Sequence, residues 1–386
     1  MVDLLTVARS NGCASSQLLD DGFARRNLEI SSGKLYFRVI GILIMKPAFL
    51  LASIIFFQTF AIADSWDIYN NPSKFDSNYE YHFQKLPLAS SLSPQNIPWS
   101  ESYWPRNKGS INQRWNSPKK EGFDYISPSR NQVLSMSYAE LSRLSPAEKF
   151  DLAQGFYHYP LSGYVARVNA KKNAKDFEGI CDGWTASAIQ FKEPKPVDIV
   201  NPDGITIPFG SSDVKALISY VGAFHTNLGP ILVGRYCTTF GFGARCDDIN
   251  PGTLHVILAN EIGLKQQAFA ADVEIGRETW NQPVFAYEFE VKGSALSSAP
   301  NALRIHAKMH YTDELEISEW QPVTGTDKFV SAFHELDYIL ELDYSGRITG
   351  GYWITTGKHP DLFWKPTKPI QFQGDFALLN KIYQPI

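Results

Sequence analysis

Along the chain, the pattern of apolar and polar positions changes from helix-like to strand-like near Pro251. Before that point, Ser137 and Ser145 each stand three residues ahead of a glutamate, which is the spacing of a capping box at a helix start. After it, short apolar and β-branched runs are separated by Gly, Pro, Asn or Asp, a pattern typical of antiparallel strands. The predicted strands are Thr253–Asn260, Phe269–Ile275, Val284–Val291, Leu303–Tyr311, Tyr338–Tyr344 and Ile348–Thr355.

The order of these elements, helices first and strands afterwards, predicts an α+β fold with a single antiparallel sheet. Two more helices are expected to start at Cys181 and at Ser211, where small or polar residues lead into apolar runs. Residues 64–130 are rich in Asn, Ser, Pro and Trp and lack a sustained period. We therefore expect them to form an irregular arm around the domain of residues 131–386. Its aromatic anchors are predicted at Trp99, Trp104 and Trp115.

The segment from Met45 to Ala63 has the features of a secretory signal peptide. It has a basic start at Lys46, then an apolar run, then the cleavage site Ala61-Ile62-Ala63. Because a signal peptide opens its chain, we expect Met45 to be the initiator and residues 1–44 to be an upstream extension. An uncleaved signal-anchor is the alternative interpretation. Either way the domain is expected in an oxidising compartment, secreted or periplasmic.

Composition narrows the class of protein. The chain has 386 residues and a formal net charge of −4, which argues against a nucleic-acid-binding protein held by phosphate contacts. Aromatic residues make up 13% of the chain, a share that suits β-sheets. With 4 cysteines the chain is not a small disulfide-rich fold, so it depends on an apolar core.

Cys181 is the candidate nucleophile. A thiol in the first turn of a helix receives the helix field and nearby backbone amides, which lower its pKa and can bind an oxyanion. Cys237 and Cys246 are nine positions apart in a glycine-containing loop and are predicted to form a disulfide, while Cys13 lies in the upstream extension. That pairing makes Cys181 the remaining thiol of the exported chain, which favours a reactive role over that of a small buried apolar residue.

A thiol nucleophile needs a general base and a group that orients this base. His255 is the preferred base, because the start of a predicted strand would hold its imidazole rigidly. His225 and His310 are the alternatives. Asp272 in the next strand is the preferred orienting group, since two consecutive antiparallel strands could place it beside His255 on one face.

Other side chains could support or replace members of this site. Glu274 is the rival to Asp272, two positions further along the strand. Asn260 could supply a papain-like amide, although its odd spacing from His255 puts the two on opposite sheet faces. Trp184, in the first turns of the Cys181 helix, is a candidate for supporting the oxyanion.

Metal ligands are sparse in the sequence. His306 and His310 are four positions apart but have no third ligand that would make a zinc site. The acidic runs at Asp247–Asn250 and Asp313–Glu316 lack the pattern of an EF-hand calcium loop. These runs are therefore interpreted as solvated loops.

The segment Trp280–Val284, with the sequence WNQPV, resembles the peptide core of the oomycete transglutaminase elicitor family, an internal segment that plants perceive. The resemblance covers about residues 100–370. Its further blocks are Cys181–Trp184, Phe209–Leu217, Asp248–Val256, Leu340–Gly346, Gly350–Trp353 and His359–Asp361. The next residues, Phe285–Tyr287, depart from the basic, glycine-containing sequence of the elicitor. This departure argues against perception by plants without affecting catalysis. The absence of Asn-X-Ser/Thr sites with X other than Pro, and a different N-terminal arm, indicate a bacterial relative.

The resemblance implies a papain- or transglutaminase-like core in residues 131–386. It implies a secreted, Ca²⁺-dependent protein-glutamine γ-glutamyltransferase that joins proteins bearing Gln and Lys through a thioester. Cys181 would be the nucleophile, His255 the base and Asp272 its partner. A papain-like cysteine protease or a glutamine deamidase is the alternative enzyme, and a non-catalytic secreted binding or elicitor-like protein is the alternative of another class. Neither a nucleic-acid partner nor a membrane span after signal cleavage is expected.

The WNQPV segment also carries a structural prediction. Pro283 cannot donate to a strand ladder, so the segment is expected to be a turn or a strand start. It would link the strand of Asp272 to the strand of Val284, with Trp280 packed as an anchor. The segment is thus predicted to be primarily structural.

Overall fold

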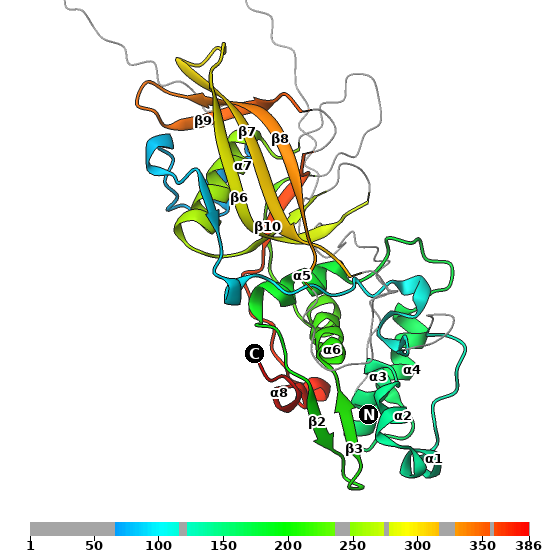
Figure 1. Cartoon of the computed structure of the whole chain (residues 1–386). Helices are drawn as coiled ribbons and strands as arrows, with labels where there is room; N and C mark the ends of the chain where they lie inside the picture. Colours follow the sequence, from blue (N-terminus) through cyan, green and yellow to red (C-terminus); the bar gives the residue numbers. More distant parts are fainter. Residues whose placement is uncertain are drawn as a thin grey trace, which may run out of the picture.

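The computed structural model describes residues 66–115, 122–235, 248–273, 278–315, 329–355 and 359–385. Figure 1 shows an elongated molecule with most of the helices at one end and a large twisted sheet at the other. The α+β class predicted from the sequence is confirmed. The predicted signal peptide and the residues before it lie outside the described residues.

Four helices of the helical region begin at the positions that the sequence predicts. Both predicted capping boxes are present, with Ser137 and Ser145 as N-caps. Cys181 is the first residue of its helix, and Gly210 is the N-cap of the helix that starts at Ser211. The helices of this region are α1 (Arg130–Ser135), α2 (Tyr138–Ser142), α3 (Pro146–Ala153), α4 (Pro160–Tyr164), the π-helix η7 (Val165–Asn169), α5 (Cys181–Gln190), α6 (Ser211–Phe224) and α8 (Leu379–Ile382). A small hairpin of β2 (Val197–Val200) and β3 (Thr206–Phe209) completes it.

The sheet region is built on an eight-stranded antiparallel sheet in the order β4-β10-β5-β6-β7-β8-β9, with β1 paired to β6. Its strands are β1 (Ala89–Ser91), β4 (Ile231–Gly234), β5 (Phe269–Asp272), β6 (Asn281–Ser294), β7 (Asn301–Thr312), β8 (Ser331–Leu342), β9 (Ile348–Trp353) and β10 (Leu362–Lys365). Five of the six predicted strands are therefore present. The sequence pattern missed β10, which brings the end of the chain between β4 and β5.

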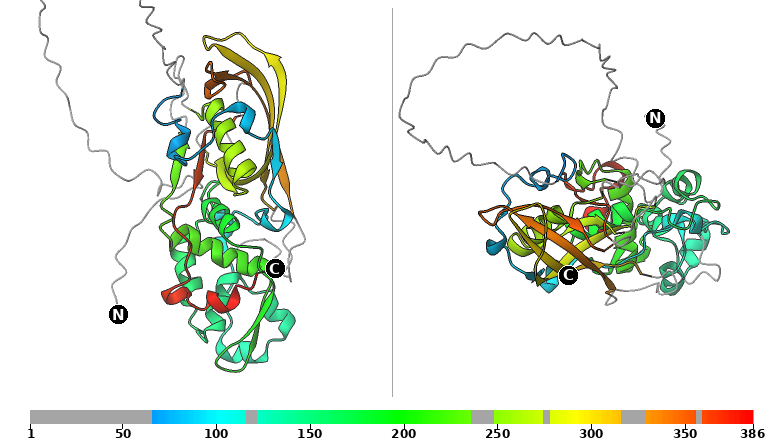
Figure 2. Two further views of the ribbon diagram at one scale, coloured as in Figure 1. Left: turned by 90° about the vertical axis from the view of Figure 1, so that its left-hand side faces the viewer. Right: turned by 90° about the horizontal axis from the view of Figure 1, so that it is seen from above.

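The sixth predicted strand, Thr253–Asn260, is wrong. Its residues form helix α7 (Pro251–Leu258), which continues as the π-helix η8 (Ala259–Leu264). Every residue of α7 is buried, so the helix has no polar face and its apolar run has no helical period. Helix α7 packs on one face of the sheet against β8 and β9 (Figure 2). The signal for a helix was the start, where Asn250 accepts a hydrogen bond from the Gly252 N–H at 2.9 Å and Pro251 follows.

Residues 66–115, the first described part of the predicted arm, form short 3-10 helices and the strand β1 and contact both regions. The predicted anchors Trp99, Trp104 and Trp115 are all buried. Trp99 Nε1 donates to the Phe191 carbonyl at 2.9 Å, and Trp115 Nε1 donates to Asp213 at 2.8 Å. These bonds tie the arm to the helical region, while β1 ties it to the sheet.

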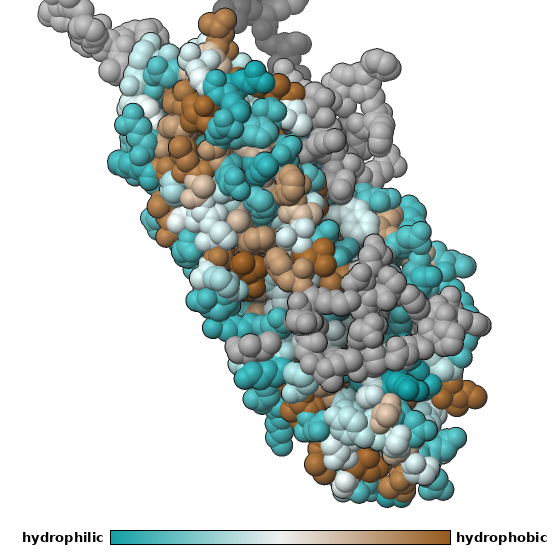
Figure 3. Space-filling model, in the orientation of Figure 1, coloured by the Kyte–Doolittle hydropathy of each residue, from teal (hydrophilic) through white to brown (hydrophobic). Residues whose placement is uncertain are grey.

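The buried apolar side chains form two clusters, one among α3, α5 and α6 and one between the sheet and α7. On the face of the molecule drawn in Figure 3, hydrophobic and hydrophilic residues are interspersed rather than gathered into one area. No helix in the described part of the chain has the length and apolar character needed to cross a membrane.

Candidate active site

Cys181 is the first residue of α5, and its side chain is fully buried. Ile180 before it has a non-helical φ of −126° and donates its N–H to the Tyr103 carbonyl at 2.7 Å, so the helix starts at the cysteine. Helix α5 lies very close to α6 because residue 183 is glycine. A Cβ at Gly183 would stand 2.2 Å from the Ser219 carbonyl oxygen. The helix start thus holds the thiol inside the protein.

Thr279, before β6, and Asn281, its first residue, supply two polar contacts of the sulfur. The thiol of Cys181 donates to the Thr279 carbonyl at 3.8 Å, and Asn281 Nδ2 lies 3.5 Å from Sγ. One turn along α5, the Thr185 hydroxyl donates to the Asn281 carbonyl at 2.7 Å. All four residues are buried. Helix α5 is therefore fixed to the first residue of β6 at two points.

A carboxylate stands next to the thiol along the chain. Asp182 Oδ1 accepts the Gly183 N–H at 2.8 Å, and burial raises the pKa of Asp182 to about 6. When this carboxyl is ionised, its charge on the neighbouring residue disfavours a thiolate at Cys181, and donors to the sulfur would offset that effect.

The arm segment Trp99–Trp104 covers the start of α5. Trp184 Nε1 donates to the Trp99 carbonyl at 3.2 Å, and the rings of Tyr103 and Trp280 meet edge-on with their centroids 5.7 Å apart. An indole has a single N–H, and that of Trp184 already donates to the Trp99 carbonyl of the arm. The structure therefore gives no evidence that Trp184 donates to an oxyanion, as the sequence predicted.

His255 lies in the other apolar cluster, on α7 rather than on a strand. Its Nδ1 is 2.8 Å from the Tyr338 hydroxyl, and its ring stacks on Phe289 with the centroids 3.9 Å apart. Burial lowers the pKa of His255 to about 3. Its Nε2 is buried without a hydrogen-bond partner among the described residues. The imidazole is thus a neutral part of the sheet core.

The structure does not bring His255 to Cys181. Both have a neighbour on β6: Asn281 beside the sulfur and Phe289 against the imidazole, eight positions further along. At the usual rise of a strand this separation is about 25 Å, far beyond the reach of a hydrogen bond. The expectation that they pair depended on the wrong assignment of Thr253–Asn260 to a strand.

Asp272 is the last residue of β5 and is buried, as expected, but it does not lie beside His255. Its Oδ1 accepts the Trp280 N–H at 2.8 Å, and in the sheet it stands opposite Asn281. Asp272 therefore belongs to the hairpin that contacts Cys181. Its predicted rival Glu274 lies outside the described residues.

The other sequence candidates have separate surroundings. Asn260 lies on η8, where its Nδ2 donates to the Glu80 carbonyl and its Oδ1 accepts the Glu80 N–H, both at 2.9 Å. His225 follows the last turn of α6, with its ring centroid 4.5 Å from that of Phe376. His310 lies on β7, 3.4 Å from a Glu288 carboxylate oxygen. Each of these contacts is structural.

The described residues do not fit a Ca²⁺ site. Within them, no group of three or more His, Cys, Asp and Glu side chains converges as a metal site would. Asp248 lies against His359 Nδ1 at 3.4 Å, and Asp313 accepts weakly from Gln282 at 3.5 Å. Calcium dependence therefore stays a prediction from the resemblance. The predicted disulfide also stays a prediction, because Cys237 and Cys246 lie outside the described residues.

Comparison with known families tests the family resemblance that the sequence predicts. Residues 169–317, which include Cys181 and the WNQPV segment, match the model of the transglutaminase elicitor family. The predicted resemblance is therefore confirmed. Among curated proteins, none matches the chain.

The structure resembles the crystal structure of the GP42 transglutaminase from Phytophthora sojae, with a TM-score of 0.62 and 22% sequence identity. The match covers 81% of this chain and 98% of that chain. At this identity, the likeness shows a shared fold. The two proteins therefore share the mixed arrangement of helices and antiparallel sheet.

The WNQPV segment is a strand start, as predicted. Asn281 begins β6, and Pro283 stands opposite Ala270 of β5. Trp280 is only partly buried, so its ring is less of an anchor than expected. The sequence did not assign Thr279 or Asn281 to the surroundings of Cys181. Nothing in the local pattern shows that α5 docks on this hairpin.

Proposed function

We propose that the protein is an exported protein-glutamine γ-glutamyltransferase with Cys181 as its nucleophile. The observation that carries the proposal is the position of Cys181 in the part of the chain that matches the family. It lies at the first residue of a ten-residue helix, with its sulfur in contact with Asn281 and Thr279. A thiol at a helix start has the backbone amides and the helix field that favour its thiolate.

The proposed reaction proceeds in two steps. The sulfur of Cys181 attacks the γ-carboxamide carbon of a glutamine, the C–N bond breaks, and ammonia leaves with the proton that the thiol gives up. A lysine amine then attacks the thioester, which forms an isopeptide bond and returns the thiol. Water in place of the amine gives glutamate, so the access of amine and water decides the product.

This proposal assigns no catalytic role to His255. The β6 neighbours of the two side chains, Asn281 and Phe289, are about 25 Å apart along the strand, and Nδ1 of His255 is engaged with Tyr338. A base must reach the proton that it takes, directly or through one water. The proposal therefore rests on Cys181 and the groups around it, and not on the Cys-His-Asp triad expected from the sequence.

One observation favours a second candidate, a non-catalytic secreted binding or elicitor-like protein. Cys181 is fully buried, and its sulfur contacts the Asn281 amide and the Thr279 carbonyl. In this second candidate Cys181 is a packed core residue, as buried cysteines commonly are.

Incorporation of a labelled primary amine into a glutamine-bearing protein tests the proposal. The wild-type protein is compared with Cys181→Ala, with and without a chelator. Incorporation that disappears in Cys181→Ala supports the transferase. Ammonia release without incorporation indicates a deamidase, and cleavage of the protein substrate indicates a protease. A wild-type protein indistinguishable from Cys181→Ala in all three readouts contradicts the proposal and supports the non-catalytic candidate.

Export is tested separately by sequencing the N-terminus of the protein recovered from its cells. A mature chain that starts at Asp64 supports cleavage of the signal peptide. A chain that keeps residues 45–63 supports the signal-anchor instead.

A further inference from the structure

Asn281, the second residue of the WNQPV segment, stands between three elements at the buried thiol. Its Nδ2 lies 3.5 Å from Cys181 Sγ, and its Oδ1 accepts the indole N–H of Trp364 on β10 at 2.7 Å. Its main-chain carbonyl accepts the Thr185 hydroxyl at 2.7 Å. The residue itself has no exposed surface. Its side chain is therefore held in one place by α5, β6 and β10.

The orientation of this amide follows from the chemistry of its neighbours. The two ends of an Asn side chain are distinguished by their hydrogen bonds. An indole nitrogen can only donate, so the atom that faces Trp364 must be the oxygen. The NH₂ end must then face the sulfur of Cys181. Trp364 thus fixes Asn281 as a donor toward the thiol.

A donor at this point acts on the two protonation states of the thiol unequally. Cys181 Sγ has the Thr279 carbonyl on one side, which accepts from a thiol but repels a thiolate. The Asn281 N–H on the other side bonds much more strongly to a thiolate than to a thiol. It therefore favours the anion and offsets the Thr279 carbonyl.

We propose that Asn281 is the side-chain donor that stabilises the Cys181 thiolate and the oxyanion formed on it, with Trp364 as the positioning residue for Asn281. The role of Asn281 toward the oxyanion rests on the transferase function proposed above. When Sγ bonds to the carboxamide carbon, the developing oxyanion is on that same carbon and so lies two bonds from the sulfur. The Asn281 NH₂ group faces this sulfur and is therefore close to the oxyanion. The NH₂ group and the backbone N–H groups at the start of α5 would then form the donor set. WNQPV is in this account a part of the active site.

The test uses three variants of the full protein. Asn281→Asp keeps an oxygen for Trp364 and replaces the donor at the sulfur with an acceptor. Trp364→Phe keeps most of the ring and removes the N–H that holds the amide. Asn301→Asp makes the same amide-to-carboxylate change at the exposed start of β7 and is the matched control. Thiolate absorbance against pH, taken as the difference from Cys181→Ala, gives the thiol pKa, and amine incorporation gives kcat and KM.

Asn281→Asp is expected to raise the thiol pKa by about one to two pH units. It should lower kcat by about 10²–10³-fold, the usual effect of removing one oxyanion donor, with little change in KM. Trp364→Phe should shift both quantities in the same direction by a smaller amount, and Asn301→Asp should change neither. If Asn281→Asp does not fold, as judged by its thermal melting, Trp364→Phe decides the question alone.

The proposal is overturned if a folded Asn281→Asp titrates and turns over like the wild type. It is also overturned if its activity falls only in proportion to a lower melting temperature, with the thiol pKa unchanged. These results leave the transferase function intact. Conversely, if no variant and no wild-type protein shows amine incorporation, the proposed function fails, and the thiol titration still decides whether Asn281 stabilises the thiolate.

Discussion

The helical region and the part of the sheet core around His255 bury titratable groups in different ways. In the helical region, charges are buried in pairs: Lys149 Nζ lies 2.6 Å from Asp213, and both are almost inaccessible. Burial lowers the pKa of Lys149 and raises that of Asp213, while the attraction between the two charges opposes both shifts. In the sheet region, His255 is buried as a neutral ring among aromatic side chains.

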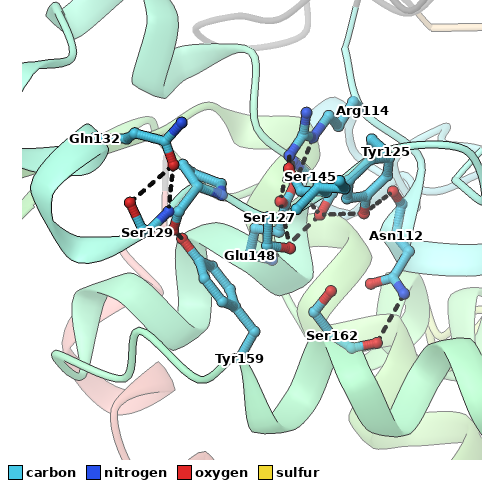
Figure 4. Close-up of polar contacts among 12 residues, drawn as sticks. Asn112, Arg114, Tyr125, Ser127, Ser129, Gln132, Ser145, Glu148, Tyr159 and Ser162 are labelled. Atoms are coloured by element: carbon cyan, nitrogen blue, oxygen red, sulfur yellow. Dashed lines mark hydrogen bonds and ion pairs between the residues drawn. The ribbon is translucent and has the colours of Figure 1, made fainter.

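Figure 4 shows a second buried carboxylate of the helical region. Glu148 accepts from Arg114 at 2.6 and 2.8 Å and from the hydroxyls of Ser127 and Ser145 at 2.9 and 3.0 Å. These bonds join the arm, the loop that follows it and the start of α3 in one network. Such networks require fixed distances, whereas an apolar core requires only volume and shape.

This contrast bears on the candidate site. Cys181 belongs to the helical region, and Asn281, the first residue of β6, lies beside its sulfur. His255 belongs to the apolar core of the other region. The order of these residues along the chain and the family resemblance predicted that Cys181 and His255 form a triad. In the structure they lie in different regions. The lesson is that a plausible set of residue types is not yet a site.

The largest effect is expected from breaking the buried ion pair. Asp213→Ala strands the Lys149 ammonium in the core, so we expect a loss of about 3–5 kcal/mol in the free energy of unfolding, measured with urea at neutral pH. The double variant Lys149→Met, Asp213→Ala removes the stranded charge and should be more stable than the single one. A cost of less than about 1 kcal/mol for Asp213→Ala would show that the pair is solvated, and the contrast between the regions would fail.

The next effect is acid sensitivity of the sheet region through His255. Its pKa is lowered from 6.5 to about 3 in the folded protein, so between these values the unfolded chain binds a proton that the folded one does not. Stability should therefore fall as the pH drops below about 6.5, by about 1.4 kcal/mol per pH unit. His255→Phe keeps a ring against Phe289 and should remove this contribution.

The measurement compares the free energy of unfolding at neutral pH and at about pH 4.5 in the two proteins. The wild type should lose about 2.7 kcal/mol more than His255→Phe over this interval. Equal losses would mean that His255 is accessible to protons in the folded state. That result would reopen its role as a base.

A smaller effect is expected at the border of the two regions. Trp280 is partly buried and meets Tyr103 edge-on, so Trp280→Ala should cost about 1–2 kcal/mol. It should also speed the alkylation of Cys181, because the arm segment Trp99–Trp104 loses a contact. Trp184→Ala is the matched control. Trp184 is fully buried, and its loss should cost about 3–5 kcal/mol. Equal costs for the two would restore Trp280 as the core anchor that the sequence predicted.

The sequence predicted the elements that have local signals. Capping boxes at Ser137 and Ser145 and the helix start at Cys181 depend on neighbouring residues, and the structure has them. Helix α7 was missed because a fully buried run has no period by which a helix differs from a strand, although Asn250 and Pro251 carried the capping signal.

Of the surroundings of Cys181, the sequence predicted the hairpin of β5 and β6 but not the docking of α5 on it. The hairpin between Asp272 and Val284 follows from local turn chemistry and is present. The docking of α5 on that hairpin depends on contacts about 100 positions apart in sequence, such as Asn281 Nδ2 to Cys181 Sγ. One sequence without its relatives contains no record of such a contact. The expected pairing of His255 with Cys181 failed for a different reason, the assignment of Thr253–Asn260 to a strand instead of helix α7.

The central claim is that Cys181 reacts through the groups around it and independently of His255. It is tested most directly by the rate of amine incorporation in His255→Gln, compared in one assay with the wild type and Cys181→Ala, after thermal melting has shown that each variant is folded. The account predicts that His255→Gln keeps a rate within about tenfold of the wild type while Cys181→Ala has none, since loss of a general base costs roughly 10²–10⁴-fold. A folded His255→Gln protein that is as inactive as Cys181→Ala would contradict the account.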